Sequence, residues 1–432
     1  MRILHTDEAL FESEFKRIKD RGKISGNSDI RKKVARILKE VEDEGDAALF
    51  RYSKKFDRVQ LTKECVEVKP EEIQAAMTEV SGEDLKILKT AAARIEKFHR
   101  KQMVKPVLDT KEKGIELGWL VRPLDRIGIY APGGLAAYPS TVLMAAIPAR
   151  VAGVKEIILV SPAKEGKLNP LVSAAAFLSG VSRIFKIGGA QAIAALAYGT
   201  ESIPAVDKIV GPGNAYVAEA KRMVFGQVGI DMIAGPSEIL IIADKKANPC
   251  CVAADLLSQA EHDNLASAVL ITPSENLAKE VAAQVHSQLK ELSRESIAAA
   301  SIRDYGAIVV TANIAEAVRI ANRFAPEHLE LMVEKPATLL PQIANAGAVF
   351  LGNHTPEAIG DYIAGPSHIL PTAGTARFSS PLGVYDFVKR SSIISFSQEA
   401  LSRFGAQAAR FAQLEGLQAH SKSISFRLSK RS

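Results

Sequence analysis

The sequence predicts an α/β protein with two parallel-sheet domains that are Rossmann-like but incomplete and non-standard, a helical N-terminal segment and a short helical C-terminal tail. Three observations lead to this fold class. The chain has 432 residues, more than a single hydrophobic core usually serves. Short apolar runs alternate with helical patterns through two successive stretches, which is typical of parallel sheets covered by helices. In the first third, apolar residues recur at helical spacing among charges.

The helical N-terminal segment follows an arm formed by residues 1–25. Apolar residues at helical spacing occupy residues 29–56 and, more densely, residues 71–101. We expect these helices to fold back onto the second of the two sheets. That sheet would then belong to a discontinuous domain, residues 26–129 plus 238–380, which carries the metal-binding and catalytic residues.

The first alternation of strands and helices predicts an inserted α/β domain, residues 130–237, which is expected to bind a dinucleotide. The expected strands are 127–130, 157–160, 184–187 and 208–210, and the expected helices are 140–152 and two that begin at Gln191 and Asn214. Because the strands and helices alternate strictly, the strands are expected to run parallel.

The second alternation predicts another parallel sheet. Its expected strands are 239–243, 268–271, 307–310, 329–333 and 348–351, and its expected helices are 250–262, 276–291 and 315–324. The remaining residues, 381–432, form the C-terminal tail. Its last stretch, from residue 397, is too short for a core of its own, so we expect it to dock on another surface.

Composition indicates a cytoplasmic enzyme. Hydrophobic residues make up 47% and charged residues 24%, and no apolar run reaches the roughly 18 residues that cross a bilayer. Acidic residues follow the first few positions, so no secretory signal is expected. The net charge of +6 is mild and comes without a nucleic-acid motif. Three cysteines, two of them adjacent, fit a reducing compartment.

Histidines are scarce and unevenly placed. His5, His99 and His286 lie in terminal or amphipathic segments and are expected at the surface. The remaining five, in the Gly- and Pro-rich second half near expected strand ends, are His262, His328, His354, His368 and His420. Loops at strand ends are where ligand sites collect, so this second group is the source of candidate site residues.

One candidate is a metal site around residues 253–262. Gln259 and His262 are three apart in the expected helix and would share a face, and an imidazole nitrogen and an amide oxygen are both ligands for Zn²⁺. A lone histidine in a helix is more often structural than a ligand. Asp361 and His420 would add further donors, but spacing alone cannot bring them together.

A second candidate is the pair Glu327-His328, which follows Pro326 between a helix and a strand. An imidazole there is suited to act as a general base. In an extended segment neighbouring side chains point to opposite faces, so one surface acid and one half-buried histidine is the alternative.

The third candidate is a nucleotide site without a standard fingerprint. The motif G-x-G-x-x-G is broken at Gly211-Pro212-Gly213, because Tyr216 stands where the third glycine belongs. Glycine-rich turns at 132–134, 188–191 and 211–214 nevertheless occur at comparable ends of expected strands. Each alone reads as a tight turn, but together on one sheet edge they favour a ligand crevice.

The string Ile230-Asp231-Met232-Ile233-Ala234-Gly235-Pro236-Ser237-Glu238, continued by Ser258-Gln259-Ala260-Glu261-His262, closely resembles the signature of the histidinol dehydrogenase family. This resemblance implies a zinc-dependent, NAD-linked, four-electron oxidation of L-histidinol to L-histidine through L-histidinal, the last step of histidine biosynthesis. It also implies a homodimer with one Zn²⁺ per subunit. No membrane or nucleic-acid partner is expected.

The resemblance also assigns roles to individual residues. Glu327 and His328 are the implied catalytic pair, with His328 as the general base and Glu327 activating water. The implied NAD contacts are Tyr130, Gln191 and Asn214, and the implied zinc ligands are Gln259, His262, Asp361 and His420. The implied substrate contacts are Ser237, Gln259, His262, Glu327, His328, Asp361, His368, Glu415 and His420. His420 and Glu415 would complete the site of the neighbouring subunit.

Two other functions compete with this one. A zinc hydrolase could use Glu327 and a metal to activate water. A binding protein could use zinc only to capture imidazole ligands. For the second oxidation, Cys250 or Cys251 could act through a thiohemiacetal, but we favour oxidation of a hydrated aldehyde because Glu327 and His328 can activate water without a covalent intermediate.

Overall fold

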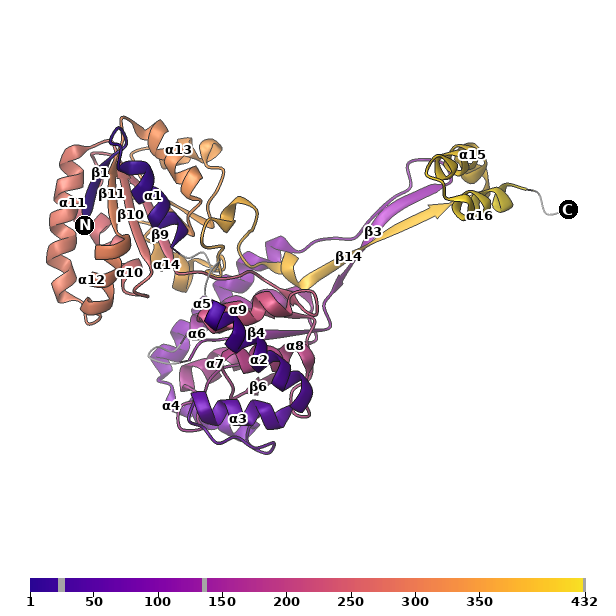
Figure 1. Cartoon of the computed structure of the whole chain (residues 1–432), viewed down its shortest axis with the longest axis horizontal. Helices are drawn as coiled ribbons and strands as arrows, with labels where there is room; N and C mark the ends of the chain where they lie inside the picture. The colour runs from indigo at the N-terminus through magenta and orange to yellow at the C-terminus, as the bar shows by residue number, and fades with distance from the viewer. Residues whose placement is uncertain (22–27, 134–137, 430–432) are drawn as a thin grey trace. The chain divides into compact units, whose positions relative to one another are not determined.

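The computed structural model describes residues 1–21, 28–133 and 138–429 (Figure 1). The chain forms two compact units. The first unit combines Met1–Gln102 with Leu124–Phe387, and the second combines Met103–Pro123 with Val388–Ser432. Each unit is described by itself.

The first unit contains a six-stranded parallel sheet in the order β1-β11-β10-β9-β12-β13. The strands are β1 (Arg2–His5), β9 (Glu238–Ala243), β10 (Ser267–Thr272), β11 (Ala307–Val310), β12 (His328–Met332) and β13 (Ala348–Leu351). The helices around it are α1 (Phe11–Asp20), α10 (Pro249–Ala260), α11 (Glu275–Gln288), α12 (Glu295–Tyr305) and α13 (Ile314–Phe324).

Helices cover both faces of this sheet. In Figure 1, α11 and α12 lie on one side of the strands, and α1 and α13 lie on the other. Ile239 and Ile241 of β9 pack with α10, α11 and α12, whereas Leu240 and Ile242 pack with α1 and α13. A strand buried on both faces reads as a continuous apolar run, as this one does.

The first unit also contains a five-stranded parallel sheet in the order β6-β5-β4-β7-β8. The strands are β4 (Arg126–Tyr130), β5 (Glu156–Val160), β6 (Arg183–Phe185), β7 (Lys208–Val210) and β8 (Gly229–Ile230). Helices α6 (Pro139–Ala152) and α7 (Pro170–Ser179) share a core with one face, and α8 (Gly189–Tyr198) and α9 (Ala215–Val224) share a core with the other.

The early helices pack on this five-stranded sheet and its helices, so the expectation that they cover the second sheet is wrong. They are α2 (Ser28–Glu44), α3 (Asp46–Phe56), α4 (Pro70–Glu79) and α5 (Gly82–His99). Val34 and Val41 join the core that holds α8, and Leu88 and Ile95 join the core that holds α6. The cause is that α8 is apolar on every side, and such a helix needs a further covering layer.

The predicted fold class is confirmed, since every expected strand and helix of both alternations is present. The sequence missed β1, β8, α7 and α12. The edge strand β1 lies in the stretch expected to be an arm, and it pairs with β11. His99, expected at the surface, is buried on the inner face of α5 beside Ile95. The division into four domains stays a prediction.

The second unit is built on antiparallel strands. Strand β3 (Ile115–Pro123) pairs along its whole length with β14 (Val388–Phe396), and β2 (Val107–Asp109) pairs with β3. Helices α15 (Gln398–Leu414) and α16 (Gln418–Leu428) follow β14 (Figure 1). The expected helical tail therefore includes a long strand, which sequence patterning missed because β3 and β14 have mostly exposed residues and no clean alternation.

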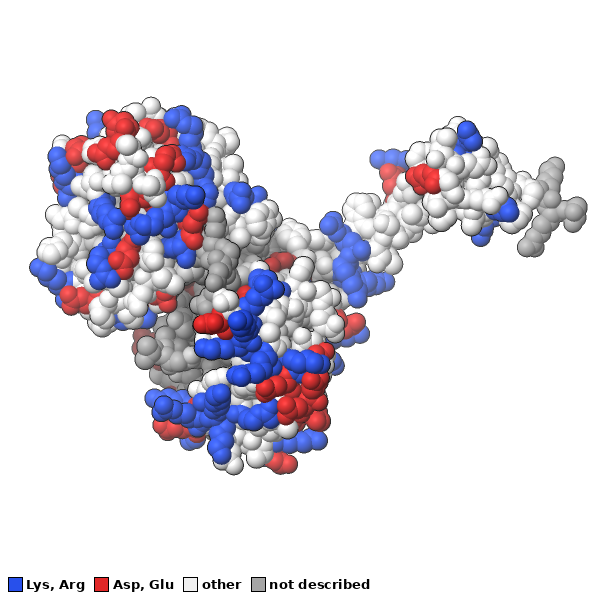
Figure 2. All heavy atoms as spheres, in the orientation of Figure 1, with Lys and Arg blue, Asp and Glu red and all other residues white. Residues whose placement is uncertain are grey.

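The described surface carries both signs of charge. On the face drawn in Figure 2, Lys and Arg are interspersed with Asp and Glu over the first unit. None of the described helices has both the length and the apolar character that a bilayer crossing requires.

Candidate functional site

A cleft of about 1160 Å³ lies in the first unit, where the two sheets contribute opposite strand ends. Residues that follow β4 and β7, such as Pro132 and Gly213, line one side. Residues that precede or begin β9 and β12, such as Ser237 and His328, line the other. The cleft therefore joins the carboxyl edge of the five-stranded sheet to the amino edge of the six-stranded sheet.

His328 begins β12 and is held in one orientation. Its Nδ1 lies 2.9 Å from the carbonyl oxygen of Glu238, which can only accept, so Nδ1 carries the proton. Nε2 then bears the lone pair, and it is buried without a hydrogen-bond partner among the described residues. Burial lowers the pKa of His328 to about 3. The ring is therefore neutral, the form that can accept a proton.

Glu327 also lines the cleft. Ala325 ends α13 with a φ of 55°, and Pro326 follows it, which turns the chain into β12. The carboxylate Oε2 of Glu327 accepts a hydrogen bond of 2.9 Å from the N–H of Glu238 and lies 3.7 Å from Nδ1 of His328. Burial raises the pKa of Glu327. Both side chains are buried, so the alternative of a surface acid is not observed.

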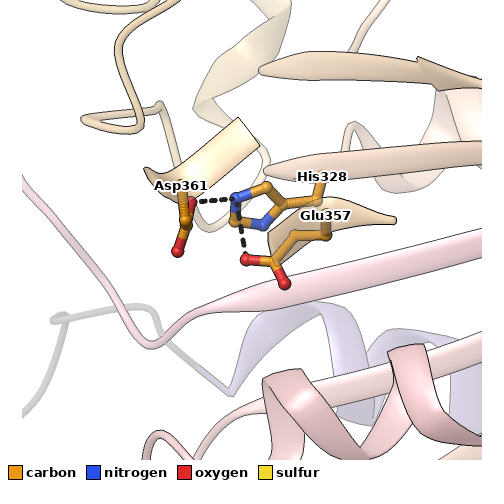
Figure 3. Close-up of side chains that lie close together, drawn as sticks. All are labelled: His328, Glu357 and Asp361. Carbon is orange, nitrogen blue, oxygen red and sulfur yellow. Dashed lines mark ion pairs between the residues drawn. The ribbon is translucent and has the colours of Figure 1, made fainter. Parts of the chain in front are cut away.

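Two acids face His328 from a short helical stretch. Glu357 begins α14 (Glu357–Ile359), and Asp361 lies in the π-helical turn η4 (Gly360–Ala364). Nε2 of His328 lies 3.7 Å from Glu357 Oε1 and 4.0 Å from Asp361 Oδ1 (Figure 3). Ligand atoms of these three residues lie within 4.8 Å of one another. Burial raises the pKa of both carboxyls, and mutual repulsion adds to the shift at Glu357. Such a cluster favours a bound cation.

Gln259 and His262 line the same cleft, but not for the reason expected. Helix α10 ends at Ala260, so His262 lies in the turn beyond it rather than on the helical face of Gln259. Gln259 is buried, and its Oε1 has no hydrogen-bond partner among the described residues. A buried acceptor left unpaired is costly, so this oxygen is suited to a ligand.

Two more of the predicted substrate contacts, His368 and Ser237, also line the cleft. His368 Nδ1 lies 3.7 Å from Asp361 Oδ1, and its Nε2 lies 3.4 Å from the hydroxyl of Thr141 on α6. Burial lowers the pKa of His368 to about 4, so this ring is also neutral.

Of the predicted dinucleotide contacts, only Asn214 lines the cleft. Its side-chain oxygen caps α9 by accepting from two backbone N–H groups. Tyr130 and Gln191 are buried: the Tyr130 hydroxyl accepts a bond of 3.1 Å from the N–H of Gly189, and Gln191 Oε1 is unpaired among the described residues. Gly134, part of the first glycine-rich turn, lies outside the described residues.

Glycine is required at one of these turns. Gly211 has a φ of 108°, and a Cβ there would lie 2.2 Å from the carbonyl oxygen of Tyr130. The backbone of the turn after β7 therefore approaches β4 more closely than any other residue would allow.

Glu415 and His420 belong to the second unit. Glu415 directly follows α15, His420 lies in the first turn of α16, and both are exposed. Their part in a site stays a prediction.

Sequence reasoning missed Glu357 and Arg21. Glu357 lies four residues before Asp361, a spacing that places two carboxylates on one helical face. That spacing could have predicted Glu357 as a site residue from the sequence. Arg21 lines the cleft from the end of α1, more than two hundred residues away in sequence from the strands it touches, and no local pattern points to it.

Comparison with known proteins shows which family the chain belongs to. The family model for histidinol dehydrogenase matches residues 20–428. The chain is 55% identical over 428 residues to a histidinol dehydrogenase of Syntrophotalea carbinolica, covering 99% of each chain, and 53% identical over 429 residues to that of Geobacter sulfurreducens, covering 99% of this chain and 100% of the relative. The crystal structure of histidinol dehydrogenase from Elizabethkingia anophelis superimposes with a TM-score of 0.93 at 40% identity, covering 99% of this chain and 98% of that one. The chain therefore belongs to the histidinol dehydrogenase family.

Proposed function

We propose that this protein oxidises L-histidinol to L-histidine through L-histidinal in two NAD-linked steps that depend on zinc, the last step of histidine biosynthesis in the cytoplasm. The observation that carries the proposal is the neutral, buried His328, whose free Nε2 faces the carboxylates in a cleft that Glu327 also lines. The names of the relatives support the substrate.

The described residues fit a zinc ion. Gln259, His262 and Asp361 offer an amide oxygen, an imidazole and a carboxylate, and the unpaired Oε1 of Gln259 gives a reason for a metal. His420 of the partner subunit would supply a fourth ligand. When bound, zinc would supply a Lewis acid that holds and polarises the substrate without changing oxidation state.

His328, Glu357 and Asp361 form a second possible set of ligands. We favour the first set, because a metal on Nε2 of His328 would occupy the lone pair that the base needs. The metal content of Gln259→Ala should then fall, whereas that of Glu357→Gln should be affected less.

His328 would take the hydroxyl proton of histidinol on Nε2 while a hydride leaves the carbinol carbon. That carbon becomes the aldehyde carbon of histidinal. Glu327 would then take a proton from water as its oxygen adds to the aldehyde, which gives the hydrate. His328, after releasing its first proton to solvent, would take a hydroxyl proton of the hydrate as the second hydride leaves for NAD⁺, and the carboxylic acid that forms ionises to the carboxylate. Each turnover consumes two NAD⁺ and one water, and NAD⁺ serves as the hydride acceptor in both steps.

Asn214, Tyr130 and Gln191 would hold the dinucleotide. Asn214 lies at the N-terminus of α9, where backbone N–H groups favour phosphate, and the Gly211 turn leaves room for a close approach. The unpaired Oε1 of Gln191 lies beside Gly189 and would be available to a bound ligand after a side-chain shift.

A homodimer would complete the site, with Glu415 and His420 contributed by the partner subunit. Support comes from the second unit, which leaves large apolar side chains in water: Ile394 is 73% exposed, Phe411 64% and Phe426 73%. Exposed apolar surface of this kind is typical of a protein interface. Glu415 would pair with the cationic amine of histidinol.

The deciding experiment is NADH formation from histidinol with and without a chelator. We expect an absorbance increase that the chelator abolishes and added zinc restores, with two NADH formed per histidinol consumed. Omitting histidinol is the control. A zinc hydrolase would form no NADH, and a binding protein would retain histidinol without turning it over.

Substitution of the adjacent cysteines should leave turnover nearly unchanged. Cys250 and Cys251 are exposed at the start of α10 and do not line the cleft, and burial raises the pKa of the Cys251 thiol rather than activating it. We therefore expect Cys250→Ser and Cys251→Ser to form histidine at the normal rate. Accumulation of histidinal by either variant would instead indicate a thiohemiacetal route.

A further inference from the structure

Arg21, directly after α1, has a side chain that is 1% exposed, and the residue forms part of the cleft wall. Its five N–H groups all have acceptors. Nε donates to Leu265 O at 2.7 Å, Nη1 to Ile18 O at 2.9 Å and Glu238 Oε1 at 3.1 Å, and Nη2 to Ser237 O at 3.0 Å and Pro236 O at 3.5 Å. One planar group thus fixes the chain entering β9 and β10, which an ammonium group could not reproduce.

Glu238, the acidic partner of Arg21, contacts both members of the catalytic pair. Its carbonyl oxygen accepts from His328 Nδ1 at 2.9 Å, and its N–H donates to Glu327 Oε2 at 2.9 Å. Its own carboxylate Oε2 accepts from the N–H of Glu327 at 3.3 Å. The orientation of both catalytic side chains therefore depends on where the first residue of β9 lies.

Arg21 is the cation that balances this buried carboxylate. Glu238 is 1% exposed, and an ionised carboxylate in such a place is stable only with a partner and a full set of hydrogen bonds. Glu238 in turn contacts both catalytic residues through its own backbone N–H and carbonyl groups.

We propose that Arg21 and Glu238 are positioning residues for the oxidation: they fix the Nδ1-protonated form and the orientation of His328 and the direction of the Glu327 carboxylate. This inference rests on the proposed function, because it assumes that His328 is the base. Weakening the contact between Arg21 and Glu238 should therefore lower the rate of the chemical step much more than it lowers the affinity for substrates.

The first test compares Arg21→Lys with Arg17→Ala. Arg17 is a matched control, since it lies one turn before Arg21 and its guanidinium lies over the same Tyr305 ring, at 5.7 Å from the ring centroid against 5.9 Å for Arg21. Among the described residues, however, its guanidinium pairs only with Glu14. We expect kcat of Arg21→Lys to fall about 100-fold, as for a displacement of roughly 1 Å at the reacting groups. KM for NAD should stay within about twofold in both variants, and Arg17→Ala should keep the wild-type kcat.

Chemical rescue separates positioning from general destabilisation. Added guanidine should restore part of the kcat of Arg21→Ala, because a free guanidinium can donate to the same oxygen atoms. It should restore nothing in His328→Asn. Rescue of kcat without a matching rise in melting temperature would support positioning, and a failure of guanidine to rescue a folded Arg21→Ala would count against it.

A double variant covers the case in which single variants do not fold. In Arg21→Met/Glu238→Gln no charge is left alone, and neutral replacement of a buried pair is often no less stable. We expect it to fold, bind histidinol and keep the low kcat. A wild-type kcat in the double variant or in Arg21→Lys would overturn the inference. Failure of the double variant to fold would also overturn it, because the role of the pair would then be purely structural. Absence of NADH from the wild-type protein would instead refute the proposed function.

Discussion

Substituting His328 by asparagine should lower kcat by about 10²- to 10⁴-fold, the usual contribution of a positioned general base. Asparagine keeps a polar group near the Glu238 carbonyl but offers no imidazole nitrogen to accept the hydroxyl proton. Histidinol should still bind, because the proposed zinc ligands and Ser237 are unchanged. Stopped-flow measurement of NADH formation, with calorimetric measurement of histidinol binding, checks both parts.

His354→Asn is the matched control for this variant. His354 is an exposed histidine in the loop after β13 and is not part of the cleft, so its loss should not change kcat. Glu327→Gln should spare histidinol binding and mainly slow the second oxidation, in which water must be activated. A His328→Asn protein with normal turnover would show that another group is the base.

Mixing two inactive variants should restore activity if the site is shared between subunits. His420→Asn removes a ligand supplied to the neighbour, and His262→Asn removes one supplied to the subunit's own cleft. In a hybrid dimer one of the two sites then has both histidines. With random exchange half of the dimers are hybrids, so about a quarter of the wild-type activity should return, measured as NADH formation after joint refolding.

Each variant refolded alone is the control and should remain inactive. If the mixture stays as inactive as the separate variants while hybrid dimers are detected by mass, each site is built from a single chain and the proposed role of His420 of the partner subunit is refuted.

Local patterns in the sequence were sufficient to predict most strands of the two parallel sheets, but not the edge strands β1 and β8 or the antiparallel strands β3 and β14. Ile239–Ile242 is an uninterrupted apolar run, and each such run is bounded by turn residues, so strand positions follow from burial alone. The placement of the early helices does not follow in this way. Val34 and Val41 specify an apolar helix face, but they do not specify which sheet it covers, because that choice depends on surfaces contributed by distant residues.

The residues of the candidate site likewise differ in whether a local pattern in the sequence points to them. Glu327, His328, Gln259, His262 and Asp361 lie in motifs that sequence reasoning could single out. Glu357 also carried a local signal, its spacing of four residues from Asp361. Arg21 could be assigned only from the fold, since its partners are brought to it by strand order. His262 lines the cleft, but from the turn after α10 rather than from the helical face expected, because the helix ends two residues before it.

The pairing of β3 with β14 bears on how the chain is made. The ribosome completes β3 by residue 123, but its partner begins only at residue 388. Throughout most of translation β3 therefore has one edge unpaired, with the half-exposed side chains of Leu117 and Trp119 beside it. An unpaired apolar edge invites aggregation. A chain truncated before residue 388 should consequently be recovered largely as insoluble protein, even though its two parallel sheets are complete.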